Sequence, residues 1–149
     1  MADALNCRLS LYADDSALIY SAPDPQSVSR FLSDELDICH KWLVDNRLSL
    51  HLGKTECILF GPKRRLNLVA DFEIKLGDIT VSRVESVKYL GVILDQFLDF
   101  SKHVDSLIKK SSSKLFFLYR NGNFLNFYVR RLLCQSLVFS NVEYCSPSW

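Results

Sequence analysis

The segment Tyr12-Ala13-Asp14-Asp15 stands between two short apolar runs near the start of the chain. Leu9-Ser10-Leu11 precedes it and Ala17-Leu18-Ile19-Tyr20 follows it. This order predicts two strands joined by a tight acidic turn. Two carboxylates on such a support suit Mg²⁺, a hard cation that prefers oxygen ligands. Asp-Asp pairs are also common in ordinary surface turns, so these four residues alone leave that reading open.

Charge is distributed unevenly along the chain. Residues 1–60 carry five basic and nine acidic side chains, whereas residues 101–149 carry seven basic and two acidic ones, within a net charge of +1. An acidic N-terminal part and a basic C-terminal part suit a metal site followed by a surface that contacts phosphates. The same distribution equally suits a protein with one basic helix face. With 149 residues and 48% hydrophobic content, the chain can bury one core or two small ones.

No feature of the sequence indicates secretion or a membrane. Segment 1–6 lacks the basic and apolar regions of a signal peptide, and no apolar run is long enough to span a bilayer. We expect an intracellular protein, in the nucleus or cytoplasm, without a membrane partner. The cysteines form no C-x-x-C pair, which argues against a zinc ribbon, and most of the five are expected to be buried thiols: Cys7, Cys39, Cys57, Cys134 and Cys145.

The remaining patterns predict an α+β fold. Asp24 before Pro25 predicts the start of a helix that continues to about residue 46. An antiparallel sheet of strands near 7–12, 16–20 and 56–60 is expected to pack on this helix. A smaller sheet is expected near 72–94, with a hairpin across Gly77-Asp78 and a strand Val87–Leu94 that contains Gly91. A glycine inside a strand predicts a bulge or a close backbone approach.

Two helices are predicted for the last third of the chain. The first begins at Asp99 or Ser101 and carries lysines outside its apolar positions. The second follows the turn Asn121-Gly122-Asn123. A short turn of this kind predicts that the two helices pack antiparallel.

The order of these motifs resembles a reverse transcriptase, most closely the RNA-directed DNA polymerases of non-LTR retrotransposons, the LINE or jockey-like group. The matching segments are Y-A-D-D at 12–15, N-R-L-S-L with K-T at 46–55, and K-Y-L-G-V-I-L-D at 88–95. The resemblance covers nearly the whole chain. It implies the C-terminal half of a polymerase palm over residues 1–95, an antiparallel sheet packed on a helix, and the start of a helical thumb over 96–149.

The resemblance also implies roles for individual residues. Asp14 would be the direct Mg²⁺ ligand and Asp15 would support the metal site. Tyr12 and Ala13 would shape the floor near the primer end, and Lys54 would lie near the incoming triphosphate. The primer would contact Tyr89, Leu90 and Gly91. Template–primer phosphates would contact the basic residues of the first thumb helix, Lys102, Lys109, Lys110 and Lys114. The implied partners are two Mg²⁺ ions, an RNA template, a DNA primer, a dNTP and the N-terminal part of the same polymerase.

The sequence departs from the family pattern in its upstream part. Reverse transcriptases use a third carboxylate on an earlier palm strand, a P-Q-G-S-type segment and a fingers region, and none is found here. Asp3 is too close to Asp14 to be that carboxylate. We therefore expect a fragment that does not polymerise alone. Two alternatives are a non-catalytic remnant with weak nucleic-acid binding and, with less support, a metal-dependent nuclease. The nuclease lacks a supporting histidine or glutamate cluster, since His40, His51 and His103 have unrelated contexts.

Overall fold

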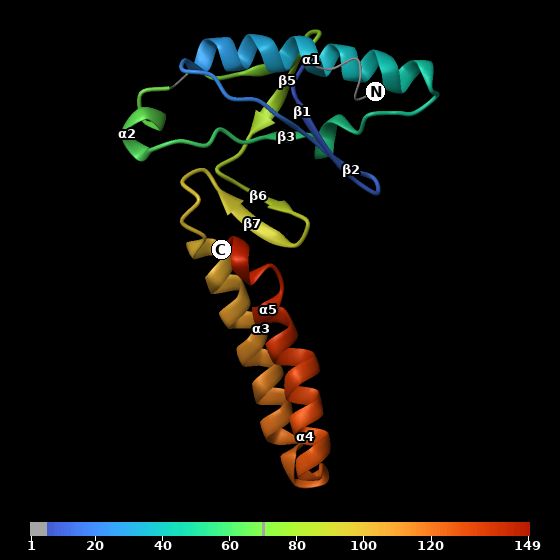
Figure 1. Cartoon of the computed structure of the whole chain (residues 1–149), viewed down its shortest axis with the longest axis vertical. Coiled ribbons are helices and arrows are strands. Elements are labelled where there is room, and N and C mark those ends of the chain that lie inside the picture. The colour runs from blue at the N-terminus through green and yellow to red at the C-terminus, as the bar shows by residue number, and fades with distance from the viewer. Residues whose placement is uncertain (1–5, 70) are drawn as a thin grey trace. The chain divides into compact units, whose positions relative to one another are not determined.

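The computed structural model describes residues 6–69 and 71–149 (Figure 1). They contain short strands, mostly paired in antiparallel hairpins, together with helices, which confirms the predicted α+β class. The chain divides into two compact units between Glu85 and Ser86. Asp3 and most of segment 1–6 lie outside the described residues. Within the described part of the chain, no helix has both the length and the apolar character needed to cross a membrane.

The first unit begins with a hairpin of β1 (Arg8–Tyr12) and β2 (Asp15–Ile19). The strands are antiparallel, and their register runs from Arg8 opposite Ile19 to Tyr12 opposite Asp15. This is the hairpin that the two apolar runs predict. Its acidic segment forms the bend.

Helix α1 (Pro25–Asp45) follows and begins at the predicted position. The Asp24 carboxylate accepts a hydrogen bond from the Ser27 backbone N–H at 2.7 Å, and Pro25 occupies the first turn, where no N–H is needed. The buried face of α1 packs over a three-stranded sheet in strand order β3-β5-β4, made of β3 (Glu56–Cys57), β4 (Ile74–Leu76) and β5 (Ile79–Arg83). The core between helix and sheet contains Val28, Leu36, Cys57, Phe72, Ile74, Leu76 and Val81.

The pairing within this sheet is partly as predicted. β4 and β5 are antiparallel across Gly77 and Asp78, which confirms the hairpin. The strand expected near 56–60 is only two residues long and pairs parallel with β5, so the prediction that it joins the first two strands is wrong. The reason is its burial: Cys57 lies in the core beneath α1, and its carbonyl accepts the Val84 N–H at 2.9 Å. Two short helical turns, η2 (Leu52–Lys54) and α2 (Lys63–Leu66), complete the unit.

The second unit joins a hairpin to two long antiparallel helices (Figure 1). β6 (Ser86–Tyr89) pairs antiparallel with β7 (Val92–Asp95), and α3 (Ser101–Arg120) follows. After the turn η3 (Gly122–Phe124), the chain returns along α3, which confirms the predicted helix pair. The returning segment consists of α4 (Phe127–Cys134), the π-helical η4 (Gln135–Phe139), α5 (Ser140–Glu143) and a last turn, η5 (Ser146–Ser148).

Candidate functional site

The acidic pair lies at the bend of the β1–β2 hairpin. Tyr12 and Asp15 are the last residues that face each other across the strands, so Ala13 and Asp14 form a two-residue loop. Ala13 has φ +51°, a conformation that costs an L-residue roughly 1–2 kcal/mol. All four residues are exposed. The hairpin thus presents both carboxylates on a tight turn, with backbone strain of the kind that concentrates at functional sites.

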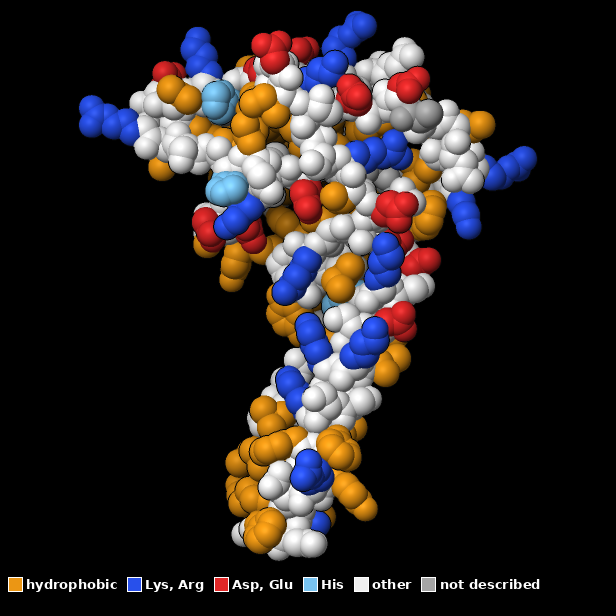
Figure 2. Space-filling model, turned by 180° about the vertical axis from the view of Figure 1, so that it is seen from behind, with side chains coloured by type: hydrophobic (Ala, Val, Ile, Leu, Met, Phe, Trp, Pro, Cys, Tyr) orange, Lys and Arg blue, Asp and Glu red, His pale blue; other side chains and the backbone are white. Residues whose placement is uncertain are grey.

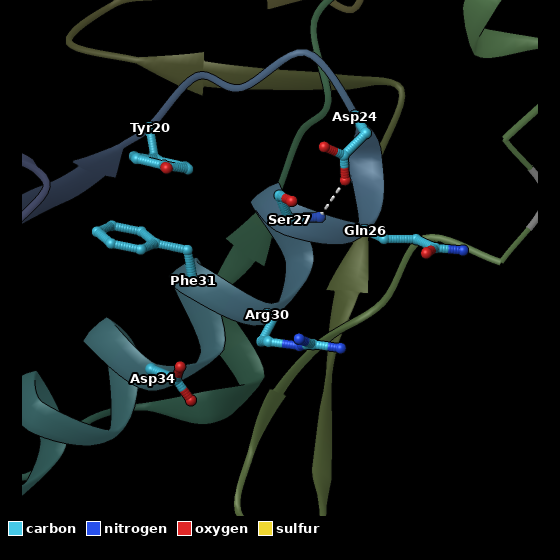
Figure 3. Close-up of a pocket in the computed structure, with 7 residues that line it drawn as sticks. All are labelled: Tyr20, Asp24, Gln26, Ser27, Arg30, Phe31 and Asp34. Carbon is cyan, nitrogen blue, oxygen red and sulfur yellow. Dashed lines mark hydrogen bonds between the residues drawn. The ribbon is translucent and has the colours of Figure 1, made fainter.

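The opposite end of this hairpin is anchored on α1. The Glu35 side chain is buried, and its carboxylate accepts hydrogen bonds from the Asn6 backbone N–H at 2.9 Å and from Asn6 Nδ2 at 3.3 Å. Just after β2, the Tyr20 ring stacks on Phe31 of α1, with ring centroids 3.9 Å apart (Figure 3). These two contacts hold the base of the hairpin on the helix and leave the acidic bend at its far end.

Glu35 was not predicted from the sequence, although one signal was available. It lies seven residues after Val28 and four before Cys39, so it falls on the buried face of α1. A glutamate on an apolar helix face needs a hydrogen-bond partner. The negative charge of Glu35 also acts on its neighbour Cys7. The partial burial of Cys7, and after it the charge of Glu35, raise the pKa of the Cys7 thiol.

A hollow of about 350 Å³ lies beside the start of α1 (Figure 3). Figure 3 shows the Asp24–Ser27 hydrogen bond that closes the first helical turn at this hollow. None of the predicted site residues lines it. Its lining is Tyr20, Asp24, Gln26, Ser27, Arg30, Phe31 and Asp34.

Asp14 and Asp15 fit part of a magnesium site. Mg²⁺ is held by one or two carboxylates and fills its other positions with waters and substrate phosphates. In residues 6–69 and 71–149, no group of three or more His, Cys, Asp or Glu side chains is placed to hold an ion. The bend therefore supplies two carboxylates, and further ligands would have to join them.

Lys54 is held in a separate turn of the same unit. Its backbone N–H bonds to the His51 carbonyl at 2.9 Å, and the Thr55 hydroxyl donates to that carbonyl at 3.2 Å. The side chain of Lys54 is exposed. This turn places a cationic side chain directly before β3.

The predicted primer-contact residues form the turn between β6 and β7. The sequence predicts one continuous strand with Gly91 inside it, and this is wrong, because the chain reverses at Leu90 and Gly91. Both residues have positive φ, +45° and +89°, as in the type I′ turns that join twisted strands. The predicted close approach does occur: a Cβ on Gly91 would lie 3.1 Å from Tyr144 Cε1.

Three aromatic residues to which the sequence assigns no role hold this turn within the second unit: Tyr144, Trp149 and His103. Tyr144 Oη donates a hydrogen bond to the Leu90 carbonyl at 2.7 Å. Trp149 Nε1 donates to the Tyr144 carbonyl at 3.1 Å, and the Trp149 ring meets His103 edge to face. His103 Nδ1 in turn accepts the Ile93 N–H of β7 at 3.3 Å. The contacts run from the turn through the C-terminal segment to α3 and back to β7.

The protonation state of His103 fits this arrangement. Its side chain is buried, and this burial is the main cause that lowers the pKa of His103. The positive charge of Lys110 is the second cause. The neutral ring is therefore favoured near pH 7, with Nδ1 free to accept the bond from Ile93.

The predicted phosphate-contacting lysines lie on one side of α3. At 100° per residue they span an arc of about 140°, and Arg120 falls within the same arc. Lys102 Nζ also bonds to Ser86 Oγ at 3.3 Å. Figure 2 shows Lys and Arg side chains along the length of this helix pair. The basic face of α3 consists of Lys102, Lys109, Lys110, Lys114 and Arg120.

Comparison with known proteins finds similarity to retrotransposon polymerases. The chain is 30% identical over 100 residues, 66% of its length, to the RNA-directed DNA polymerase from mobile element jockey of Drosophila funebris. It is 28% identical over 115 residues to the probable RNA-directed DNA polymerase from transposon BS of Drosophila melanogaster. The chain is homologous to RNA-directed DNA polymerases of non-LTR retrotransposons.

A third relative extends the comparison among these retrotransposon polymerases. The probable RNA-directed DNA polymerase from transposon X-element of Drosophila melanogaster is 22% identical over 144 residues, 95% of the chain. The matched stretches cover 10% of the jockey protein, 12% of the BS protein and 15% of the X-element protein. The chain thus corresponds to a small part of each polymerase. No family model and no solved structure matches it.

Proposed function

We propose that the chain is the part of a retrotransposon RNA-directed DNA polymerase that carries the metal-binding Tyr-Ala-Asp-Asp bend. The observation that carries this proposal is the exposed carboxylate pair at the end of an anchored hairpin, in a chain homologous to these polymerases. Asp14 and Asp15 would hold Mg²⁺. When bound, a pair of such ions stabilises the attacking and leaving oxygens of nucleotidyl transfer.

The other predicted residues take supporting roles in this proposal. Tyr12 and Ala13 shape the bend, and exposed Lys54 offsets phosphate charge on the dNTP. The β6–β7 turn, held by Tyr144, supports the DNA primer. The basic face of α3 contacts the backbone of the RNA template and primer, which adds affinity but little sequence selectivity.

The palm and thumb assignments, residues 1–95 and 96–149, belong to the same proposal. The partner of the chain would then be the rest of the polymerase. The chain would be located in the nucleus or the cytoplasm. Alone, the 149 residues are expected to be inactive, because the described residues bring no third carboxylate to the bend.

Two measurements test these statements. Primer extension on an RNA template with Mg²⁺ should give no product with the chain alone, and incorporation that Asp14→Ala abolishes would contradict the proposed inactivity. Grafted into the jockey polymerase in place of its matching segment, the chain should support extension. There, Asp14→Asn should lower the rate about a hundredfold or more, a typical loss for an electrostatic catalytic group. Asp34→Asn, an exposed aspartate of α1, is the control.

Metal binding can be measured without activity. In the isolated chain, Mn²⁺ should broaden the amide NMR signals of residues 12–16 at lower concentration than those around Asp34 and Asp37, an exposed acidic pair on α1. Broadening that is equal at both places would remove the support for a metal site at the bend.

The second candidate is a non-catalytic remnant of such a polymerase that binds nucleic acid weakly through the basic face of α3. The bend supplies only two carboxylates, Asp14 and Asp15, and this favours the non-catalytic remnant. It predicts an inactive graft together with salt-dependent nucleic-acid binding, whereas an affinity indifferent to salt would exclude it.

A further inference from the structure

Six aromatic rings are exposed at the end of the helix pair where α3 turns into α4. Phe124 is 86% exposed, Tyr119 85%, Phe127 75% and Tyr128 73%. The rings lie on the last turn of α3, on η3 and on the first turn of α4, so three consecutive elements bring them together. Figure 2 shows hydrophobic side chains gathered at this end of the helix pair. We call this set the aromatic end; it comprises Phe116, Phe117, Tyr119, Phe124, Phe127 and Tyr128.

The charge around the aromatic end has one sign only. Between Ser106 and Val142 the sequence has six Lys or Arg residues and no Asp or Glu. Arg120 lies over the Phe116 ring, 5.8 Å from its centroid, and Arg130 and Arg131 are exposed on α4. An uncharged apolar partner would leave these cations without counter-charges. The surface instead suits a partner that is both anionic and rich in flat apolar groups.

Nucleic acid has these two properties. Proteins that bind single strands combine cations that follow the phosphates with aromatic side chains on which bases stack. A duplex hides its base faces in its own stack, so exposed rings select unpaired nucleotides.

We propose that the aromatic end binds an unpaired stretch of nucleic acid, with bases stacked on its exposed rings and phosphates beside Arg120, Arg130 and Arg131. This inference rests on the proposed function, since it names the strand that the second unit engages. It adds a single-strand site to the backbone contacts assigned to the basic face of α3.

The first test is fluorescence anisotropy of the whole chain with a labelled 12-nucleotide oligo-dT and with a 12-base-pair duplex. The double substitution Phe124→Ala and Phe127→Ala should weaken single-strand binding about tenfold or more, since a base stacked on an aromatic ring contributes about that factor. Duplex binding should not change. Leu68→Ala is the matched control, because Leu68 is 85% exposed and belongs to the first unit. Circular dichroism should show the same helix content for all variants.

The second test is the salt dependence. Arg130→Gln with Arg131→Gln should reduce the slope of log affinity against log salt by about 1.4 for the single strand. Arg64→Gln with Arg65→Gln is the control, because these are also adjacent exposed arginines on a short helix.

Two results would overturn the inference. One is an equal loss of single-strand and duplex binding in the phenylalanine variant. The other is unchanged single-strand affinity with a fall in molecular mass by light scattering, which would make the aromatic end a self-association surface. Either result leaves the proposed function intact, provided that Mn²⁺ still broadens the amide signals around Asp14 and the grafted polymerase still extends the primer. A failure at Asp14 does not affect the anisotropy results.

Discussion

Asp95 shows how one buried carboxylate organises a strained loop. It is only 5% exposed, and it accepts backbone N–H bonds from Phe97 and Phe100, both at 2.9 Å, and from Asp99 at 3.3 Å. Burial by itself would raise the pKa of Asp95, but the three bonds outweigh it and lower the pKa below its ordinary value. Leu98 and Phe100 have positive φ in this loop, so the carboxylate stabilises a backbone that is otherwise unfavourable.

Asp95→Asn should destabilise the second unit by about 1–3 kcal/mol at pH 7. Because the pKa of Asp95 is lower in the folded than in the unfolded chain, its contribution is present above about pH 4 and is lost as the pH falls through the folded pKa. Urea unfolding at pH 7 and pH 3 measures this. The difference between wild type and variant should shrink at pH 3, while exposed Asp105→Asn should differ little from wild type at either pH. A difference that does not change with pH would contradict the role of the charge.

Alanine substitutions at Gly91 and Gly77 separate the energetic cost of crowding Tyr144 from the cost of the backbone conformation. Both glycines have positive φ, but a Cβ on Gly77 would meet no atom within 4 Å, whereas one on Gly91 would lie 3.1 Å from Tyr144 Cε1. Each substitution by alanine should cost about 1–2 kcal/mol for the φ alone. Gly91→Ala should cost more than Gly77→Ala, and hydrogen exchange should increase in β6 and β7. An equal loss of stability in the two variants would mean that the Tyr144 side chain moves away from the new methyl group without cost.

At the scale of elements, α1 covers the free edge of β4 with a row of polar side chains. Ser29, Ser33 and Asp37 are four residues apart on the helix and meet backbone groups of Glu73, Lys75 and Gly77, two residues apart on the strand segment. Four helical residues rise about 6 Å and two strand residues about 7 Å, so the two repeats match. The helix thereby satisfies an edge that would otherwise attract another strand.

Ser33→Ala should test this match. Its hydroxyl accepts the Lys75 N–H at 3.0 Å, and its loss should lower the free energy of unfolding by about 1 kcal/mol. Exposed Ser112→Ala on α3 is the control and should be neutral or slightly stabilising, because alanine favours helix. Thermal and urea unfolding of both variants measure the difference. No loss in Ser33→Ala would mean that water replaces the hydroxyl at this edge.

At the scale of the whole molecule, the chain exposes many of its large apolar side chains. Twelve apolar residues are buried among those described, and none of the large side chains is less than 2% exposed. Exposed apolar side chains occur in both units, for example Leu11 and Ile19 on the β1–β2 hairpin of the first unit and Phe124 in the second. Surfaces of this kind mark interfaces or make an isolated chain prone to aggregate.

We therefore expect the isolated chain to bind the dye ANS while it keeps its helical circular dichroism signal. Dye fluorescence should rise further when Leu36→Ala, a core substitution, loosens the first unit by about 2–5 kcal/mol. Leu68→Ala removes an exposed side chain and should not raise it. Fluorescence of the wild type at the level of a compact protein would contradict the expected exposure.

The sequence predicted the elements whose signals are local. Asp24-Pro25 set the start of α1, and Gly77-Asp78 set the β4–β5 turn. The acidic bend between two strands was predicted for the same reason, since a few adjacent residues determine a tight hairpin. The roles of Asp14, Asp15, Lys54 and the α3 lysines came from the family resemblance and stay predictions.

Tertiary structure decided which strands pair and which distant side chains meet. Cys57 pairs with β5 rather than with the first hairpin because burial beneath α1 outweighs any preference in a two-residue strand. The Leu90–Gly91 turn and its bond from Tyr144, 54 residues away, also depend on packing. Local sequence fixes φ, caps and periodicity, whereas strand partners and long-range contacts depend on which surfaces the folded chain can bury together.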